Sequence, residues 1–219
     1  MIPTNKPIIG REEIKAVVNV MKSGMLTSAS HNGGVKVQEL EKNICKYTGA
    51  KYAVAVNSGT AALQASLMAL DIGVGDEVVV PSFTFVATVN AIKAVGATPV
   101  FVDITPIVCT MSPADLQTKI TNKTRAIIPV HLYGHSANMK VIMNIAKYFD
   151  LPVIEDACQS LGTVYRGKHT GTIGTLGCYS LYPGKVITSG EGGIIVTNKK
   201  SLYDKLLMIR NHGMIFGYD

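Results

Sequence analysis

Two residues of opposite charge, Asp156 and Lys185, could carry chemistry in this sequence. Asp156 ends the apolar segment LPVIED, and Lys185 lies in the segment YPGK, just before the glycine-rich SGEGG. A lysine in a partly desolvated pocket loses its proton more readily and becomes a nucleophile toward aldehydes. A buried carboxylate needs a partner, and a ring nitrogen that must stay protonated suits it. The pair indicates an enzyme that holds a cofactor through an imine and tunes its ring with a buried charge.

Each of these residues also has a plain structural interpretation. A helix N-cap or a structural salt bridge accounts for Asp156 about as well when that residue is taken alone. A solvated loop is the commoner position of any single lysine. The order of the segments favours a functional Lys185, because a phosphate-type helix start, an aromatic residue and a strand-end acid precede it along the chain.

The segment NSGTAAL follows a predicted strand and opens a predicted helix. Ser58 and Thr60 supply hydroxyl groups, and Gly59 lets the backbone approach a ligand closely. A helix start adds free N–H groups and a positive dipole, so these features are typical of a phosphate site. An ordinary N-cap explains the same residues. The motif GxxxxGK[ST] is missing from the sequence, which argues against a Walker-type nucleotide site.

Three further residues follow predicted strands. Phe83 and Phe85 come just after VVVP, where an aromatic ring either stacks on a flat heterocycle or packs in the core. His131 ends the run IIPVH. It either lines the same pocket or is a hydrogen-bonded core residue.

The elements that must position these residues alternate along the chain. Apolar runs predict strands at 52–56, 77–80, 99–102, 126–130, 152–154, 178–181 and 193–196. Helical periodicity is found at 11–21, 35–48, 60–70, 88–95, 112–119, 139–149 and 201–210, and 23–34 is a loop. This alternation predicts an α/β fold with a mostly parallel sheet of about seven strands flanked by helices. Ligands bind beyond the carboxyl ends of the strands in such sheets.

Composition and charge restrict the class of protein. A hydrophobic content of 47% and a charged content of 16% are typical of an ordered chain, and 219 residues suffice for one large domain. No apolar run reaches the length of a membrane span and no signal-peptide pattern opens the chain, so we expect a cytoplasmic protein without membrane contact. The net charge of +6 mildly favours an anionic ligand, but without a basic cluster no nucleic acid is expected. The four cysteines show no CxxC pairing, so neither a metal site nor a disulfide framework is expected.

Together these segments resemble the DegT/DnrJ/EryC1/StrS family of sugar aminotransferases, which depend on pyridoxal phosphate (PLP). The matching stretches span nearly the whole chain in the family's order: SGTAAL, GDEVVVPSFTFVAT, GATPVFVDI, VHLYG, VIEDACQS, SLYPGK, SGEGGIIVTN and RNHG. The resemblance implies the large domain of the fold type I PLP-dependent transferases. It also implies a homodimer whose active sites lie near the subunit interface.

The resemblance implies a role for each residue of the predicted site. Lys185 is similar to the lysine that forms an imine with PLP and then moves protons, and Asp156 to the partner of the pyridine nitrogen. Gln159 resembles a glutamine at the 3-hydroxyl side of the ring, and Phe85 the aromatic residue that stacks on the ring. The phosphate-binding positions of the family match Ser58, Gly59, Thr60 and Ser180.

The implied reaction moves an amino group from an amino acid, glutamate in this family, to a nucleotide-linked keto-sugar. Lysine at position 185 argues against the family's sugar dehydratases, which carry histidine there. Val186 departs from the family, because many relatives have a polar residue after the lysine.

The resemblance also implies a domain organisation. Residues 1–34 are expected to form an N-terminal helix and loop, and residues 35–219 the PLP-binding large domain. Family members continue into a small C-terminal domain, which this chain, ending at Asp219, is expected to lack. Two other interpretations stay open: a catalytically silent PLP-binding or dimerisation module, and an α/β protein that binds phosphate without forming an imine at Lys185.

Overall fold

The computed structural model of the chain describes residues 6–28 and 30–214. Positions 1–5, 29 and 215–219 belong to the expected segments 1–34 and 35–219 but lie outside the described residues. The helices are α1 (Arg11–Ser23), α2 (Val35–Thr48), α3 (Gly59–Ala69), α4 (Val86–Ala94), α5 (Pro113–Lys119), the short 3-10 helix η1 (Leu132–Gly134), α6 (Met139–Tyr148) and α7 (Lys200–Arg210). The strands are β1 (Tyr52–Val56), β2 (Glu77–Pro81), β3 (Thr98–Val102), β4 (Thr124–Ile127), β5 (Ile154–Asp156), β6 (Val164–Tyr165), β7 (Lys168–His169), β8 (Leu176–Ser180) and β9 (Gly193–Thr197).

Seven of these strands form two sheets that adjoin each other. The first sheet has the order β1-β9-β8-β5 and the second the order β3-β2-β4. Two isolated parallel bridges, Ile127 to Val153 and Val130 to Asp156, connect the sheets between β4 and β5. Neighbouring strands are parallel except at β9, which runs antiparallel to both β1 and β8. The chain reverses there because a loop, not a crossover helix, joins β8 to β9. The predicted α/β fold with a mostly parallel sheet is confirmed.

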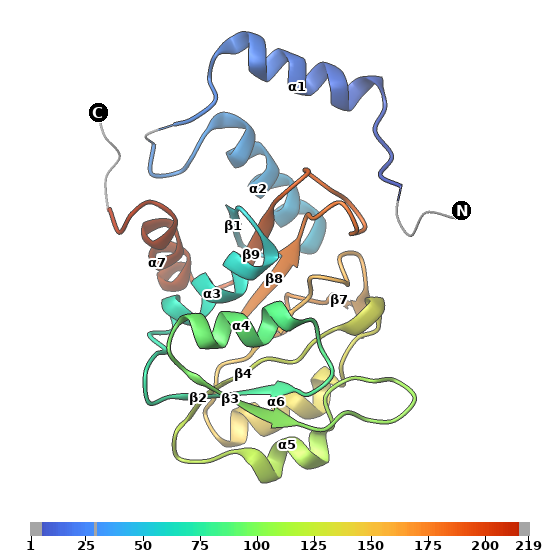
Figure 1. Ribbon diagram of the computed structural model, residues 1–219, viewed down its shortest axis with the longest axis vertical. Coiled ribbons are helices and arrows are strands. Elements are labelled where there is room, and N and C mark those ends of the chain that lie inside the picture. Colours follow the sequence, from blue (N-terminus) through green and yellow to red (C-terminus); the bar gives the residue numbers. More distant parts are fainter. Residues whose placement is uncertain (1–5, 29, 215–219) are drawn as a thin grey trace.

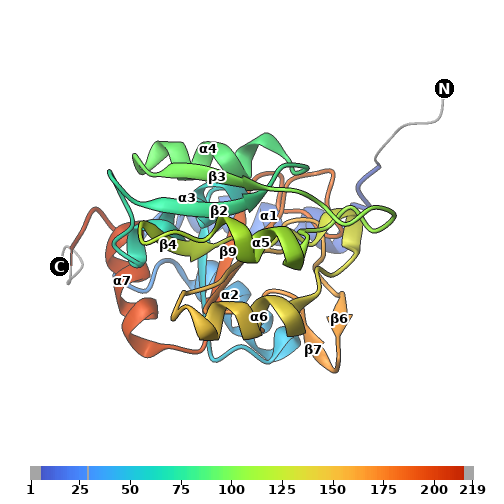
Figure 2. The ribbon, with the colours of Figure 1, turned by 90° about the horizontal axis from the view of Figure 1, so that it is seen from below.

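Helices cover both faces of the strands, as Figures 1 and 2 show. Helices α3 and α4 lie on one face, and α2, α5 and α6 lie on the other. Strand β2 illustrates the packing, because Val78 and Val80 belong to the core beneath α3 and α4, whereas Val79 belongs to the core beneath α5 and α6. All three side chains are fully buried. Burial on both faces explains why the strands are continuous apolar runs in the sequence.

Strands β4 and β5 depart from their predicted ranges for identifiable reasons, and β8 begins two residues before the predicted 178–181. Strand β5 lies two residues later than the predicted 152–154, because the backbone of Glu155 and Asp156 pairs with β8 whatever their side chains are. Asp156 is therefore the last residue of the strand. Strand β4 ends at Ile127, before the predicted end at Val130, since Pro129 has no N–H group for the ladder.

The hairpin of β6 and β7 was not predicted. Each of its strands has two residues, too few to produce an apolar run. The turn residues Arg166 and Gly167 both have positive φ, 50° and 81°. Such a two-residue turn matches the twist of a tight hairpin.

An ion pair connects the last helix to α2. The guanidinium of Arg210 pairs with Glu41 and also donates to the carbonyl oxygens of Ala55 and His31. The N–H of Ala55 donates to the same Glu41 carboxylate at 2.8 Å. The two charged side chains are only 15% and 10% exposed. Burial raises the pKa of Glu41, and the amide of Ala55 and the guanidinium of Arg210 oppose that shift.

We expect Arg210→Met to lower the free energy of unfolding by about 3 kcal/mol at neutral pH, because Glu41 is left buried without its cation. The pKa of Glu41 then lies still further above its unfolded value, so the folded state holds the proton to higher pH than the unfolded state does. Stability relative to the parent protein therefore falls as pH rises through that window, and the loss is smaller in acid. Urea titrations at several pH values measure this, with Arg210→Lys as the charge-conserving control. A loss independent of pH would contradict the assignment.

Candidate functional site

One cavity of about 520 Å³ brings together the eight residues that the sequence assigned to the cofactor site, whereas Phe83 and His131 do not line it. Its volume falls in the range of roughly 300–1,000 Å³ that is usual for small-molecule sites. The lining residues come from separate segments of the chain. These are the turn after β1, the residues before α4, the ends of β5 and β8, and the loop before β9. The predicted residues among them are Ser58, Gly59, Thr60, Phe85, Asp156, Gln159, Ser180 and Lys185.

Helix α3 begins at the wall of this cavity. Ser58 Oγ caps the helix by accepting the N–H of Ala61 at 3.1 Å. Helix geometry leaves the N–H groups of Gly59 and Thr60 without an intrahelical carbonyl. A Cβ atom at Gly59 would lie 2.8 Å from Cys158 Sγ, so this close approach requires glycine. The wall therefore offers backbone N–H groups, a hydroxyl group and the positive end of a helix dipole, which suit a phosphate. The capping and the phosphate interpretations of NSGT are compatible.

Strand β8 ends at Ser180, and the segment after it contributes Lys185. Ser180 Oγ accepts the N–H of Tyr182 at 3.3 Å, so the hydroxyl proton of Ser180 can be donated to a ligand. A turn places Lys185, whose N–H donates to the carbonyl oxygen of Tyr182 at 2.9 Å. Lys185 is half-buried. Tyr182 and Glu191 also line the cavity, although the sequence did not single them out.

Asp156 lies at the base of the cavity and is only 5% exposed. The hydroxyl of Thr88 donates to its Oδ2 at 2.8 Å, and the N–H of Cys158 donates to its Oδ1 at 3.1 Å. Between residues 6 and 214, position 29 aside, Asp156 forms no ion pair, and the turn after β5 is not a helix. The salt-bridge and helix-cap interpretations are therefore wrong. Each carboxylate oxygen keeps lone pairs that can accept a proton donor of a ligand.

Gln159 and Phe85 complete the walls. Gln159 Oε1 accepts the N–H of Tyr133 at 2.9 Å, which leaves Nε2 as the donor of this amide. Tyr133 has φ of 51°, in the left-handed region, so this hydrogen bond supports a strained backbone. The side chain of Phe85 is 63% exposed and that of Phe83 is 44% exposed, so core packing explains neither. Phe85 lines the cavity, whereas Phe83 contacts the ring of Tyr133.

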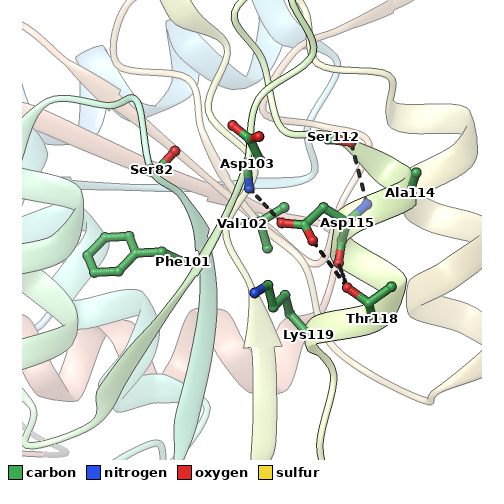
Figure 3. A pocket seen from close by; sticks show the side chains of 9 residues that line it. All are labelled: Ser82, Phe101, Val102, Asp103, Ser112, Ala114, Asp115, Thr118 and Lys119. Atoms are coloured by element: carbon green, nitrogen blue, oxygen red, sulfur yellow. Dashed lines mark hydrogen bonds between the residues drawn. The ribbon is translucent and has the colours of Figure 1, made fainter.

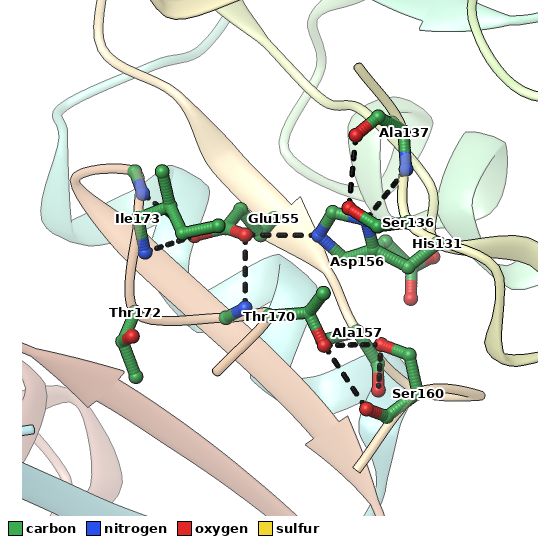
Figure 4. A network of polar contacts seen from close by, with 12 residues as sticks. His131, Ser136, Ala137, Glu155, Asp156, Ala157, Ser160, Thr170, Thr172 and Ile173 are labelled. Carbon is green, nitrogen blue, oxygen red and sulfur yellow. Dashed lines mark hydrogen bonds and ion pairs between the residues drawn. The ribbon is translucent and has the colours of Figure 1, made fainter. Parts of the chain in front are cut away.

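A second carboxylate, Glu155, is fully buried next to Asp156 in the chain (Figure 4). Strand alternation points consecutive side chains to opposite faces of the sheet. Glu155 accepts four hydrogen bonds on its own face. Its donors are Nε2 of His131 at 2.9 Å and the N–H groups of Gly171 at 2.8 Å, Ile173 at 2.6 Å and Gly174 at 2.6 Å.

His131 is a core residue with both ring nitrogens satisfied. The N–H of Ala137 donates to Nδ1 at 3.1 Å, so the ring proton resides on Nε2 and is donated to Glu155. The ring is fully buried and does not line the cavity. Of the two interpretations of IIPVH, the hydrogen-bonded core residue is confirmed.

We expect Glu155→Gln to lower the free energy of unfolding by about 2 kcal/mol, because one amide oxygen cannot replace two acceptor oxygens. Each carboxylate oxygen of Glu155 accepts two donors, so the NH₂ group of the glutamine would face two N–H groups in either orientation. Urea titration measures the loss. The exposed Glu39 provides the matched control, and Glu39→Gln should change stability by less than about 0.5 kcal/mol. Parent-like stability of Glu155→Gln would contradict the four-donor assignment.

A larger depression of about 680 Å³ lies beside α5 (Figure 3). Both acids in this depression accept hydrogen bonds from nearby backbone amides. Asp115 accepts the N–H of Asp103 at 2.8 Å, and Asp103 accepts the N–H of Ile104 at 2.7 Å. The amide of Asp103, with smaller contributions from Thr118 and Lys119, lowers the pKa of Asp115. These carboxylates stabilise turns and offer no arrangement for catalysis. The 520 Å³ cavity is therefore the candidate site.

Other kinds of site find no support in the described part of the chain. Residues 6–28 and 30–214 contain no cluster of three or more His, Cys, Asp or Glu side chains that could hold a metal ion. Within the same ranges, no helix combines the length and hydropathy needed to cross a bilayer. Cys158 and Cys178 are free thiols, and burial raises the pKa of both, so they remain protonated.

Comparison with known proteins identifies the class to which this fold and cavity belong. The sequence pattern of the DegT/DnrJ/EryC1/StrS aminotransferase family matches residues 7–217, and the chain belongs to this family. It is 43% identical over 213 residues to GDP-perosamine synthase from Escherichia coli O157:H7. That match covers 97% of this chain and 57% of the synthase.

Solved structures agree with this assignment. DesV from S. venezuelae superposes with a TM-score of 0.89 at 40% identity, covering 95% of this chain and 55% of DesV. The PLP-form of Spr1654 from Streptococcus pneumoniae also gives 0.89, at 33% identity, covering 97% of this chain and 58% of Spr1654. The chain thus spans little more than half the length of each of these relatives.

Proposed function

We propose that this chain binds PLP in the 520 Å³ cavity and transfers an amino group from an amino acid to a nucleotide-linked keto-sugar. The observation that carries the proposal is the convergence of Lys185, Asp156 and a helix start on one cavity from distant parts of the chain. Family membership and the likeness to the PLP-form of Spr1654 support the cofactor. GDP-perosamine synthase supports the substrate class.

The cavity residues fit PLP group by group. The start of α3, with Ser58, Gly59 and Thr60, suits the phosphate, and Ser180 adds a hydroxyl donor. Asp156 suits a protonated pyridine nitrogen, and the exposed ring of Phe85 suits a flat heterocycle. Bound PLP supplies an aldehyde that condenses reversibly with amines and a ring that accepts electrons when a substrate carbon loses a proton.

The protein residues then have distinct tasks. Lys185 Nζ would bind the aldehyde carbon of the cofactor and, as a free amine, would take and return the proton at the reacting carbon of the substrate. Asp156, held by Thr88 and Cys158, keeps the proton on the ring nitrogen. Gln159, whose Oε1 accepts the N–H of Tyr133, would offer its Nε2 donor to the 3-hydroxyl side of the ring.

We also propose the substrates of the protein, its oligomeric state and its location in the cell. We take glutamate as the amino donor and a GDP-linked keto-sugar as the first acceptor to test, on the strength of the 43% identity to GDP-perosamine synthase. The working unit is a cytoplasmic homodimer. Exposed aromatic side chains at the cavity, Phe85 at 63% and Tyr182 at 53%, give a second subunit apolar surface to cover.

We expect the purified protein to bind added PLP with a visible absorption band, and borohydride to fix one PLP molecule on Lys185. Lys185→Ala removes the only amine proposed to bond the cofactor, so it should abolish both the band and the adduct. Peptide mapping by mass spectrometry identifies the modified residue. Lys168→Ala, in the β6–β7 hairpin, is the matched control and should behave as the parent. An adduct confined to other lysines would contradict the proposal.

A second candidate is a PLP-binding or dimerisation module without turnover. Release of 2-oxoglutarate from glutamate by the PLP-loaded chain separates the two candidates. We expect this release, and an amino-sugar product when a panel of keto-sugar nucleotides that includes GDP-linked ones is added. PLP bound at Lys185 without either product would favour the silent module.

A further inference from the structure

Two threonine hydroxyl groups connect the open cavity to the buried carboxylate of Asp156. Thr88 Oγ1 lies 2.8 Å from Asp156 Oδ2, and Thr84 Oγ1 lies 2.8 Å from Thr88 Oγ1. Thr88, in the first turn of α4, is fully buried, whereas Thr84 lines the cavity. Neither residue was singled out from the sequence, because a threonine near a helix start is common there for local reasons.

Counting protons gives the direction of each hydrogen bond. An ionised carboxylate only accepts, so the single hydroxyl proton of Thr88 goes to Asp156. Thr88 must then accept from Thr84, whose own lone pairs remain for the cavity side. The N–H of Cys158 holds the other carboxylate oxygen at 3.1 Å. Each oxygen of Asp156 thus has one fixed donor, and together the two donors set the torsion of its side chain.

We propose that Thr88, supported by Thr84, is a positioning residue of the cofactor site: it fixes Asp156 in the orientation that accepts the ring-nitrogen proton of bound PLP. This inference rests on the proposed function, since it requires the PLP ring to lie against Asp156. Thr88 itself is too deeply buried to touch a ligand and acts through the carboxylate alone.

The backbone gives Asp156 only part of this restraint. The amide of Cys158 is two residues away on the same turn and binds Oδ1 alone. Without Thr88, the carboxylate can rotate about that single hydrogen bond, or it stays in place with Oδ2 short of a donor. Either change weakens its interaction with the ring nitrogen, and hydrogen bonds to charged groups typically alter an equilibrium by about tenfold or more.

A double-mutant cycle tests the inference, with the equilibrium dissociation constant of PLP as the readout. Thr88→Val keeps the shape of the side chain but removes the hydroxyl, and we expect it to raise the PLP dissociation constant about tenfold. Thr88→Ser restores the donor and should remain within about twofold of the parent. In the Asp156→Ala background, Thr88→Val should have no further effect, because its only route to the cofactor is gone.

The other outcomes overturn the inference in distinguishable ways. A full tenfold effect of Thr88→Val in the Asp156→Ala background, or equal weakening by Thr88→Ser, would show that Thr88 acts through packing. A parent protein that binds no PLP would overturn the proposed function, and the inference with it. Urea titration without PLP checks that each variant folds. If Thr88→Val does not fold, Thr88→Ala provides the same cycle, with the same loss expected in the parent and none without Asp156.

Discussion

The burial of two consecutive carboxylates at the end of β5 is the constraint on which the polar structure around the cavity depends. A buried carboxylate costs several kcal/mol unless hydrogen-bond donors surround it. Glu155 is satisfied by His131 and three backbone amides, and Asp156 by Thr88 and one amide. Strand alternation separates the two side chains, so Glu155 organises the loop behind the sheet while Asp156 faces the ligand site. The framework and the site thus share one strand.

Close backbone contacts hold the walls of the cavity around these carboxylates. A Cβ atom at Gly193 would lie 2.1 Å from the carbonyl oxygen of Ser58, so only glycine lets β9 pass against the start of α3. Gly177 in β8 is restricted in the same way, because a Cβ atom there would lie 1.9 Å from the carbonyl oxygen of Gly171. Gly171 in turn donates to Glu155. The start of α3 and the buried network are therefore both positioned by backbone packing.

Local signals in the sequence predicted the fold and most residues that meet at the cavity, whereas Gln159 and Ser180 were assigned only through the family resemblance. Apolar runs mark strands buried on two faces, and polar residues at their carboxyl ends mark the ligand edge. Contacts between distant segments leave no such signal. Three features became evident only in the structure. They are the ion pair of Arg210 with Glu41, the hydrogen bonds from Thr84 through Thr88 to Asp156, and the hairpin of β6 and β7. Strand β5 was misplaced because its acids lack the hydropathy of a buried strand, although the backbone pairs normally.

A crystal structure of the chain grown with PLP would show whether segments from distant parts of the chain form a single PLP site. We expect continuous electron density between Lys185 Nζ and the cofactor, with the ring nitrogen beside Asp156 and the phosphate at the start of α3. Density for PLP elsewhere on the chain, or in this cavity with its phosphate at Asp156, would rule out the proposed site.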